Sequence, residues 1–327
     1  MTMLRSHEAS EAGGAVRETT APTTSRMPFV ARLARDRSFL LMVLPAVVLL
    51  LVFTYIPLVG NLIAFTDYQP YLPIQDSPWT GLTNFRLLFS DPAFWQAVWN
   101  TVQITFLQVL VAFPIPIALA LLLSSVISTR IRRIVQTVVY LPHFLSWVLV
   151  VALFQQVLGG SGVVNQVLQQ NGLGAVGFMT NPDTFKLLIV AQGVWKDAGW
   201  GTIIFLAALT AIDDALYESA AIDGADWWQR LWHVTLPGIR PIIAILLILT
   251  LGQSLNVGFE QVLLQRGNVG PDAAEVLDTY VYFHGVGDGN FGLGAAAGLF
   301  KGLVGLALVL IANKIAHWLG EEGVYSR

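Results

Sequence analysis

Six apolar segments, each long enough to cross a lipid bilayer as a helix, run through this chain of 327 residues. Only 12% of the residues are charged, about half the share of roughly 25% that is usual in soluble domains, and 55% are hydrophobic. The sequence therefore predicts an all-α, polytopic membrane protein with six transmembrane helices. The predicted helices cover residues 39–65, 94–126, 134–158, 187–212, 242–264 and 292–319.

The connection between the fourth and fifth predicted helices, residues 213–241, is polar but is patterned like folded structure. Its first part has helical spacing, and Gly224 then supplies a backbone turn. Asp226 followed by Gln229 is a capping-box pattern that opens a second short helix, which Pro237 is expected to end. The apolar face of this helix would carry Trp227, Trp228, Leu231 and Trp232. The sequence thus predicts a helix–turn–helix on the membrane surface, and we call residues 213–241 the helix-pair loop.

Part of this loop matches most of the pattern E-A-A-x-x-x-G, extended to D-G-A and closed by L-P. The matching residues are Glu218, Ser219, Ala220, Ala221, Asp223, Gly224, Ala225, Leu236 and Pro237. The pattern resembles that of permease subunits of binding-protein-dependent ABC importers. Ser219 replaces the usual first alanine, a change between small residues that leaves close packing possible. The segments 195–209 and 275–286 resemble the carbohydrate-uptake branch of that family, and the resemblance covers most of the chain after Phe39.

The resemblance implies a type I importer permease that moves carbohydrate, in particular an oligosaccharide, across the cell membrane by alternating access. It implies a second homologous permease, two cytosolic ATPase subunits and an extracytoplasmic solute-binding protein as partners, and no nucleic acid. In the family, the helix-pair loop is the coupling element that fits a cleft on the ATPase. The residues implied in coupling here are those of the pattern together with Arg230.

The placement of lysine and arginine predicts the orientation in the membrane. Most of these residues lie before the first helix, between the second and third helices, in the helix-pair loop and in the C-terminal tail. Both termini and the helix-pair loop are therefore predicted to be cytoplasmic. Residues 1–37 would form a disordered cytoplasmic tail, residues 38–320 the permease domain, and residues 321–327 a short cytoplasmic tail.

The sequence contains no pattern typical of a catalytic or nucleotide-binding site. The phosphate-binding loop G-x-x-x-x-G-K-[ST] is absent, so ATP would be bound and hydrolysed by partner subunits. The five histidines are scattered, no two of them have metal-ligand spacing, and there is no cysteine. We therefore expect a non-catalytic permease subunit with no cofactor, catalytic residue or metal site of its own.

Polar residues within predicted helices are candidates for a substrate pathway, because such residues are costly in hydrocarbon. In the fifth helix, Gln253, Asn256 and Glu260 are spaced three and four residues apart and would share one face, with Phe259 beside them. This face suits a sugar, whose hydroxyls need donors and acceptors and whose rings stack on aromatic side chains. Hydrogen bonds between helices, worth about 0.6–2 kcal/mol each, are the other interpretation.

Charged residues occur at two further places within the predicted helices. Lys196 and Asp197 are adjacent and point about 100° apart, which favours an ion pair with another helix or a snorkelling Lys196. Lys301 follows a run of mostly small residues, 292–298, which favours close helix packing and leaves a cavity-lining role open.

Two other classes of function remain open. One is an ion-gradient-driven secondary transporter for a polar solute, although six helices is few and only Glu260 is a candidate mid-membrane carboxylate. The other is a membrane scaffold without a substrate, which has little use for three polar residues on one face. Dependence of uptake on ATP distinguishes an ABC importer from a secondary transporter.

Overall fold

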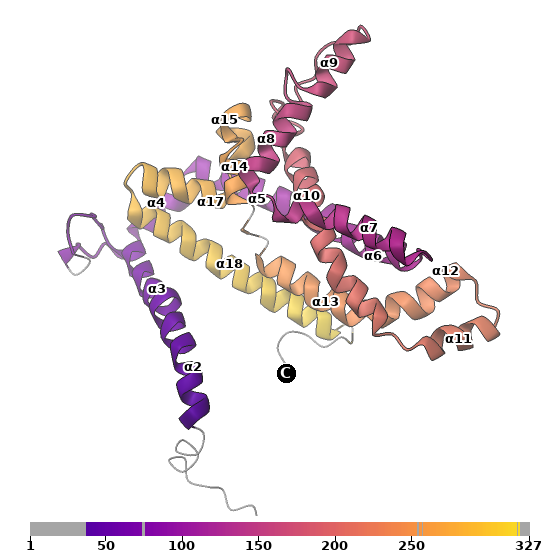
Figure 1. Ribbon diagram of the computed structural model, residues 1–327. Coiled ribbons are helices and arrows are strands. Elements are labelled where there is room, and N and C mark those ends of the chain that lie inside the picture. The colour runs from indigo at the N-terminus through magenta and orange to yellow at the C-terminus, as the bar shows by residue number, and fades with distance from the viewer. Residues whose placement is uncertain (1–36, 74–75, 254, 257, 319, 321–327) are drawn as a thin grey trace, which may run out of the picture. The chain divides into compact units, whose positions relative to one another are not determined.

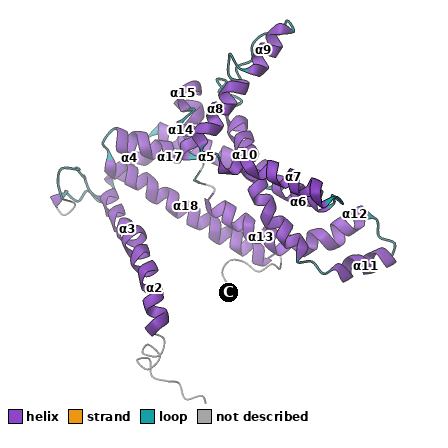
Figure 2. Cartoon of the chain, viewed as in Figure 1, coloured by secondary structure: helices purple, strands orange, loops and turns teal. Residues whose placement is uncertain are grey.

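The structure is a computed structural model that describes residues 37–73, 76–253, 255–256, 258–318 and 320. Within these residues all regular structure is helical, and a single antiparallel bridge joins Thr66 to Trp79 (Figure 2). This confirms the all-α fold. The predicted tails fall outside the described residues, except that Arg37 begins the first helix.

The chain divides after Val59 into two compact units. The described part of the first unit is α2, Arg37–Leu50, followed by a π-helical turn, Leu51–Tyr55, and by the start of α3, Ile56–Gly60 (Figure 1). These helices contain no buried residue although they are strongly apolar. Such a surface is expected of a helix that is surrounded by lipid.

The second unit holds the remaining helices (Figure 1). They are α4 Thr83–Ser90, α5 Pro92–Leu107, α6 Pro114–Ser124, α7 Thr129–Tyr140, α8 Trp147–Leu158, α9 Val163–Gln170, α10 Phe185–Thr210, α11 Asp214–Ile222, α12 Trp227–Arg230, α13 Leu236–Gln253, α14 Phe259–Leu263, α15 Arg266–Val269, α16 Pro271–Ala274, α17 Leu277–Tyr280 and α18 Phe291–Trp318.

Five helical stretches among the described residues are long and apolar enough to cross a membrane. They are Arg37–Phe65, Pro92–Ser124, Trp147–Gln170, Trp227–Gln253 and Phe291–Trp318. A sixth is reached if α10 and α11, which are bent by 67° at their junction, are counted as one span. These stretches follow the order of the six predicted helices, with corrections to the third and the fifth.

The third predicted helix, residues 134–158, is interrupted in the structure. Helix α7 ends at Tyr140, a 3-10 turn covers Leu141–Phe144, and Leu145 is extended. Pro142 has no amide hydrogen to donate, which favours a break at this point. Ser146 then caps α8 by accepting a hydrogen bond from the amide of Leu149 at 3.4 Å. The membrane-spanning part therefore starts at α8 and not within α7.

The largest buried cluster fixes α17 against α5 and α18. The ring of Phe94 lies 5.6 Å from that of Tyr280 and 5.2 Å from that of Phe300, and Phe94 and Tyr280 are fully buried. The Tyr280 hydroxyl donates to Asp91 Oδ2 at 2.5 Å. Burial, together with Asp91, raises the pKa of Tyr280 far above its ordinary value, so the hydroxyl remains protonated as a donor.

The small residues at the start of α18 pack closely, as predicted, but only in part of the run. A Cβ on Gly294 would lie 2.8 Å from the Cα of Gly285, and one on Gly292 would lie 2.5 Å from Nδ2 of Asn84. A Cβ on Gly298, in contrast, would meet nothing within 4 Å. The prediction of close packing is therefore right for the first turn of α18 and wrong at Gly298.

Candidate functional site

The first helix of the helix-pair loop, α11, has a defined beginning and end. The side chain of Asp213 accepts a hydrogen bond from the amide of Ala215 at 2.9 Å. At the other end Gly224 has φ +78°, a backbone conformation that glycine adopts readily. The amide of Gly224 donates to Ala221 O at 3.1 Å and that of Ala225 to Ala220 O at 2.9 Å, which is a Schellman motif. The predicted helix and the predicted turn at Gly224 are confirmed.

The second helix begins as predicted but does not end as predicted. The Gln229 amide donates to Asp226 Oδ1 and the Asp226 amide donates to Gln229 Oε1, each at 2.8 Å, which completes the capping box. After α12, a π-helical segment, Leu231–Thr235, leads directly into α13. The wider hydrogen bonding of that segment lets Pro237 stand near the start of α13 without breaking the helix. The prediction that Pro237 ends the second helix is wrong.

The outer surface of the helix-pair loop is not covered by any other described part of the chain. Helix α11 has no buried residue, and Glu218, Ser219, Ala221 and Asp223 are exposed, as is Pro237. The side chains of Trp228 and Trp232 are each 62% exposed, which is unusual for large aromatic residues. Ala220, Ala225, Arg230 and Leu236 are half-buried. The loop therefore exposes small, acidic and aromatic side chains.

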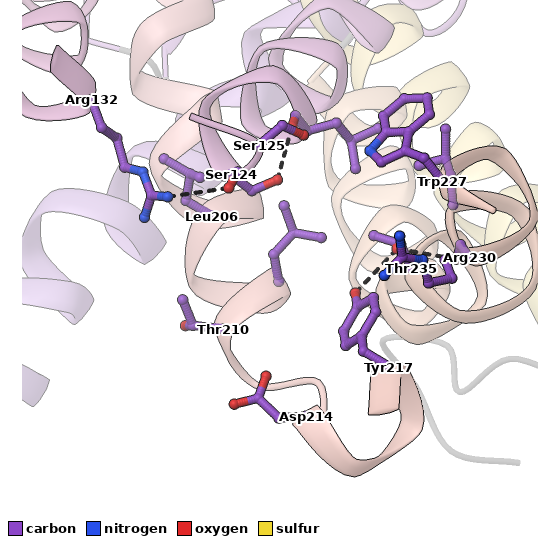
Figure 3. Close-up of a pocket in the computed structure, with 13 residues that line it drawn as sticks. Ser124, Ser125, Arg132, Leu206, Thr210, Asp214, Tyr217, Trp227, Arg230 and Thr235 are labelled. Atoms are coloured by element: carbon purple, nitrogen blue, oxygen red, sulfur yellow. Dashed lines mark hydrogen bonds between the residues drawn. The ribbon is translucent and has the colours of Figure 1, made fainter. Parts of the chain in front are cut away.

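The two helices of the loop are tied together on their inner side. The hydroxyl of Tyr217 lies 3.1 Å from Oγ1 of Thr235 (Figure 3). Tyr217 and Thr235 line a cavity of about 410 Å³, which we call the Tyr217 cavity. Ser124 and Arg132 line the same cavity. Arg132 donates to the carbonyl oxygens of Ser124, at 3.1 Å, and Val126, at 2.7 Å. The inner side of the loop thus faces the end of α6.

A second cavity, of about 510 Å³, lies among α6, α10 and α13, and we call it the Trp200 cavity. Its polar wall includes Gln108, Asp197, Thr250 and Gln253, next to the indole of Trp200. An aromatic plane beside several hydrogen-bonding groups is the composition of a small-molecule site. Of the four substrate-lining residues that the sequence suggested, only Gln253 lies here.

Asp197 and Trp200 have a common partner in the break between α7 and α8. Nδ1 of His143 is 2.8 Å from Asp197 Oδ1, and its ring stacks on Trp200 with centroids 4.6 Å apart. The ammonium group of Lys196 donates to the carbonyl of His143 at 2.6 Å and lies 5.6 Å from the ring of Trp147. Both side chains therefore interact with the segment between α7 and α8, and Lys196 Nζ also lies 3.9 Å from Asp197 Oδ1, a long ion pair between the two adjacent residues. In the sequence, an acidic residue followed three positions later by a tryptophan, Asp197 and Trp200, was the signal that could have indicated this wall of the Trp200 cavity.

The other three suggested residues are separated from Gln253 by a break in the predicted fifth helix. Helix α13 ends at Gln253, and Gly258, with φ +35°, precedes α14. Asn256 lines a third cavity, of about 380 Å³, which we call the Lys301 cavity. The ring of Phe259 packs against that of Tyr282 with centroids 5.6 Å apart, and Glu260 is exposed. The prediction that Gln253, Asn256 and Glu260 share one helical face is wrong, because α13 ends at Gln253 and a new helix, α14, begins only after the left-handed Gly258.

Hydrogen bonding between helices does account for a neighbouring polar residue. Gln261 is buried and donates to Gln192 Oε1 at 2.8 Å and to Ile189 O at 2.9 Å. Gln192 and Gln265 exchange two further amide hydrogen bonds, of 3.0 and 2.9 Å. This network satisfies amide groups that would be costly to bury unpaired. It therefore holds α10 to α14, and the side-chain NH2 groups of all three glutamines donate within it.

Comparison with known proteins gives consistent matches along the chain. Residues 112–320 match the family model described as "Binding-protein-dependent transport system inner membrane component". The chain is 43% identical to "Polygalacturonan/rhamnogalacturonan transport system permease protein YteP" of Bacillus subtilis (strain 168), over 92% of this chain and 94% of that protein. It is 42% identical to "Protein LplB" of the same organism, over 91% of this chain and 94% of that protein.

Solved structures give the same result. The chain superposes with a TM-score of 0.83 and 39% identity on a subunit of a bacterial alginate ABC transporter, solved in complex with a pentasaccharide-bound periplasmic protein. This match covers 90% of this chain and 99% of that chain. The chain therefore belongs to the inner membrane components of binding-protein-dependent transport systems, and it is a multi-pass permease subunit of an ABC importer in the cell membrane.

Proposed function

We propose that this chain is the translocation subunit of an ATP-driven oligosaccharide importer, in which a cytosolic ATPase docks on the helix-pair loop. The chain would pair with a second homologous permease, two ATPase subunits and an extracytoplasmic solute-binding protein. The permease itself would bind no ATP. The observation that carries this proposal is the exposed pair α11–α12, capped at both ends of α11 and at the start of α12, whose outer surface has no partner within the described chain.

The docking surface would consist of the pattern residues. Glu218 would pair with basic groups of the ATPase cleft, and the small residues Ala220, Ala221 and Gly224 would allow close approach. The exposed indoles of Trp228 and Trp232 would contribute apolar area at the edge of the contact.

A single helical stretch would transmit movement of the loop. Residues Trp227–Gln253 form one apolar helical stretch of 27 residues, which is about 40 Å long at 1.5 Å per residue. Trp227 lines the Tyr217 cavity at its loop end, whereas Thr250 and Gln253 line the Trp200 cavity at its other end. Displacement of α12 by the ATPase would therefore move a wall of the Trp200 cavity, and this is the basis that we propose for alternating access.

The Trp200 cavity would form this subunit's part of the sugar pathway. Trp200 offers a ring for stacking, and Gln108, Thr250 and Gln253 offer donors and acceptors for hydroxyl groups. Asn256 would extend the pathway into the Lys301 cavity. Phe259 and Glu260 line neither of these two cavities. Both termini and the helix-pair loop would lie on the cytoplasmic side, with the solute-binding protein on the opposite side.

The proposal is tested by purifying the tagged full-length chain from its native membrane in mild detergent and identifying the proteins that accompany it. We expect a second permease and an ATPase with a phosphate-binding loop. Glu218→Lys should lose the ATPase and keep the second permease, because the change reverses the charge on the docking surface. Asp183→Lys, the same kind of change at an exposed site before α10, should keep both. Retention of the ATPase by Glu218→Lys would refute this docking surface.

A further inference from the structure

An ion pair joins the last membrane-spanning helix to α17 and lies outside the Trp200 cavity. The ammonium group of Lys301, on α18, pairs with the carboxylate of Asp278, on α17. Their side chains are 17% and 22% exposed. Lys301 lies about 15 Å along the span Phe291–Trp318, so its charge is placed at a depth where charged groups are costly.

The ion pair lies at the wall of a cavity. Lys301 and Asp278 both line the Lys301 cavity, and Asn256 contributes a polar side chain to the same wall. Gly298 and Gly302 flank the lysine, and a Cβ on either would meet nothing within 4 Å. These glycines therefore leave room beside the lysine, unlike the closely packed glycines at the start of α18.

The ion pair is not needed to hold α17 in place. The neighbouring residues Leu277, Thr279 and Tyr280 are fully buried or nearly so, and Tyr280 is bonded to Asp91. Asp278 is the residue of this short helix that lines the cavity. A buried ion pair is also a poor source of stability, because desolvation offsets most of its attraction. A role in binding explains better why the structure places two charges at this position.

The chemistry of the pair fits a carboxylate ligand. An ammonium group has three donors, and Asp278 does not occupy all of them. Asp278 is fixed by its buried neighbours, whereas the lysine stem is flanked by glycines that leave it room to turn. In the structure, Asp278 neutralises the lysine. With a sugar acid present, the carboxylate of the sugar would replace or join Asp278 as the partner of Lys301.

We infer that Lys301, kept neutralised by Asp278, is a specificity residue that recognises the carboxylate of an acidic oligosaccharide, one built from uronic acid residues, as it passes through this subunit. The inference rests on the proposed function and adds to it the substrate class and the residue that selects it. Asn256 would bind a hydroxyl group of the same sugar unit.

The test uses the complete transporter with its binding protein in proteoliposomes and two matched probes. Trigalacturonate carries carboxylates, and its full methyl ester has the same rings without charge. The quantity measured is the ratio of acid uptake to ester uptake, relative to wild type, so that the selectivity of the binding protein cancels. The double variant Lys301→Gln with Asp278→Asn removes both charges and leaves no unpaired ion. We expect it to lower this ratio about tenfold or more, from the loss of one charge-assisted hydrogen bond.

Lys301→Arg serves as the matched control, since it keeps the positive charge, and it should keep the acid preference within about threefold. A double variant with an unchanged ratio would overturn the inference, because a structural pair affects both probes equally. Wild type that takes up only the ester would overturn the inference and leave the proposed function standing. Wild type that takes up neither probe, with its ATPase unresponsive to any loaded binding protein, would overturn both.

Discussion

Gly224→Asp is expected to reduce sugar uptake by at least about 100-fold while the protein stays inserted in the membrane. Gly224 has φ +78° at the turn between α11 and α12, and a Cβ there would meet nothing within 4 Å. The aspartate would cost the fold about 1 kcal/mol for its left-handed backbone. Its carboxylate would project from the loop surface, where docking of the ATPase would bury it without a partner. Uptake of labelled sugar and the amount of permease in the membrane are the two measurements.

Gly172→Asp is the matched control for this prediction. Gly172 has φ +76° in the connection after α9, and a Cβ there would also meet nothing within 4 Å. The two substitutions therefore make the same chemical change in the same backbone conformation. Uptake should be normal with Gly172→Asp. Equal loss in both variants, or normal uptake with Gly224→Asp, would contradict the role assigned to the helix-pair loop.

Gly199→Ala is expected to destabilise the protein by about 3 kcal/mol or more. A Cβ on Gly199 would lie 2.1 Å from the carbonyl oxygen of Val139 and 2.5 Å from its carbonyl carbon. Backbone atoms of α7 cannot move aside as a side chain can, so α7 and α10 would have to separate. The change should also disturb His143 and its contacts with Asp197 and Trp200. Thermal unfolding of the purified protein in detergent, followed by loss of the monodisperse peak in size-exclusion chromatography, measures the effect.

Gly193→Ala, on the same helix, is the control. A Cβ at Gly193 would meet nothing within 4 Å, so the substitution gains helix propensity of up to about 1 kcal/mol without a clash. Its unfolding temperature should equal or exceed that of wild type. If both variants unfold alike, the close approach of α7 to α10 is not what makes Gly199 necessary.

The features that could be predicted from the sequence depend on short-range chemistry. The turn at Gly224 and the capping box of Asp226 and Gln229 each involve residues within a few positions of one another. The apolar segments were also recognisable, because length and hydrophobicity alone make a segment a candidate for crossing a bilayer. These local signals determine the helix-pair loop almost completely, and its structure matches the prediction up to α12.

The features that could not be predicted depend on contacts between segments that are far apart in the sequence, or on local changes of backbone conformation that the amino-acid composition does not indicate. Pro237 is compatible with a continuing helix only because a π-helical segment precedes it. The predicted fifth helix ends at Gln253 and resumes as α14 only after the left-handed Gly258, although glycine also occurs within intact helices here. Lys301 and Asp278 are separated by 23 residues and meet through packing of α17 against α18. The suggested sugar-binding face at Gln253, Asn256 and Glu260 was wrong as a shared face for the same reason, since it assumed an unbroken helix.

The energy source of uptake tests the central claim most directly. The complete transporter, with its permease pair, ATPase subunits and binding protein, is reconstituted in proteoliposomes that contain either ATP or a non-hydrolysable analogue, with and without proton and sodium gradients. We predict uptake that requires hydrolysable ATP on the side of the ATPase and does not change with either ion gradient. Uptake by the chain without the ATPase, driven by an ion gradient, would contradict the account and favour a secondary transporter.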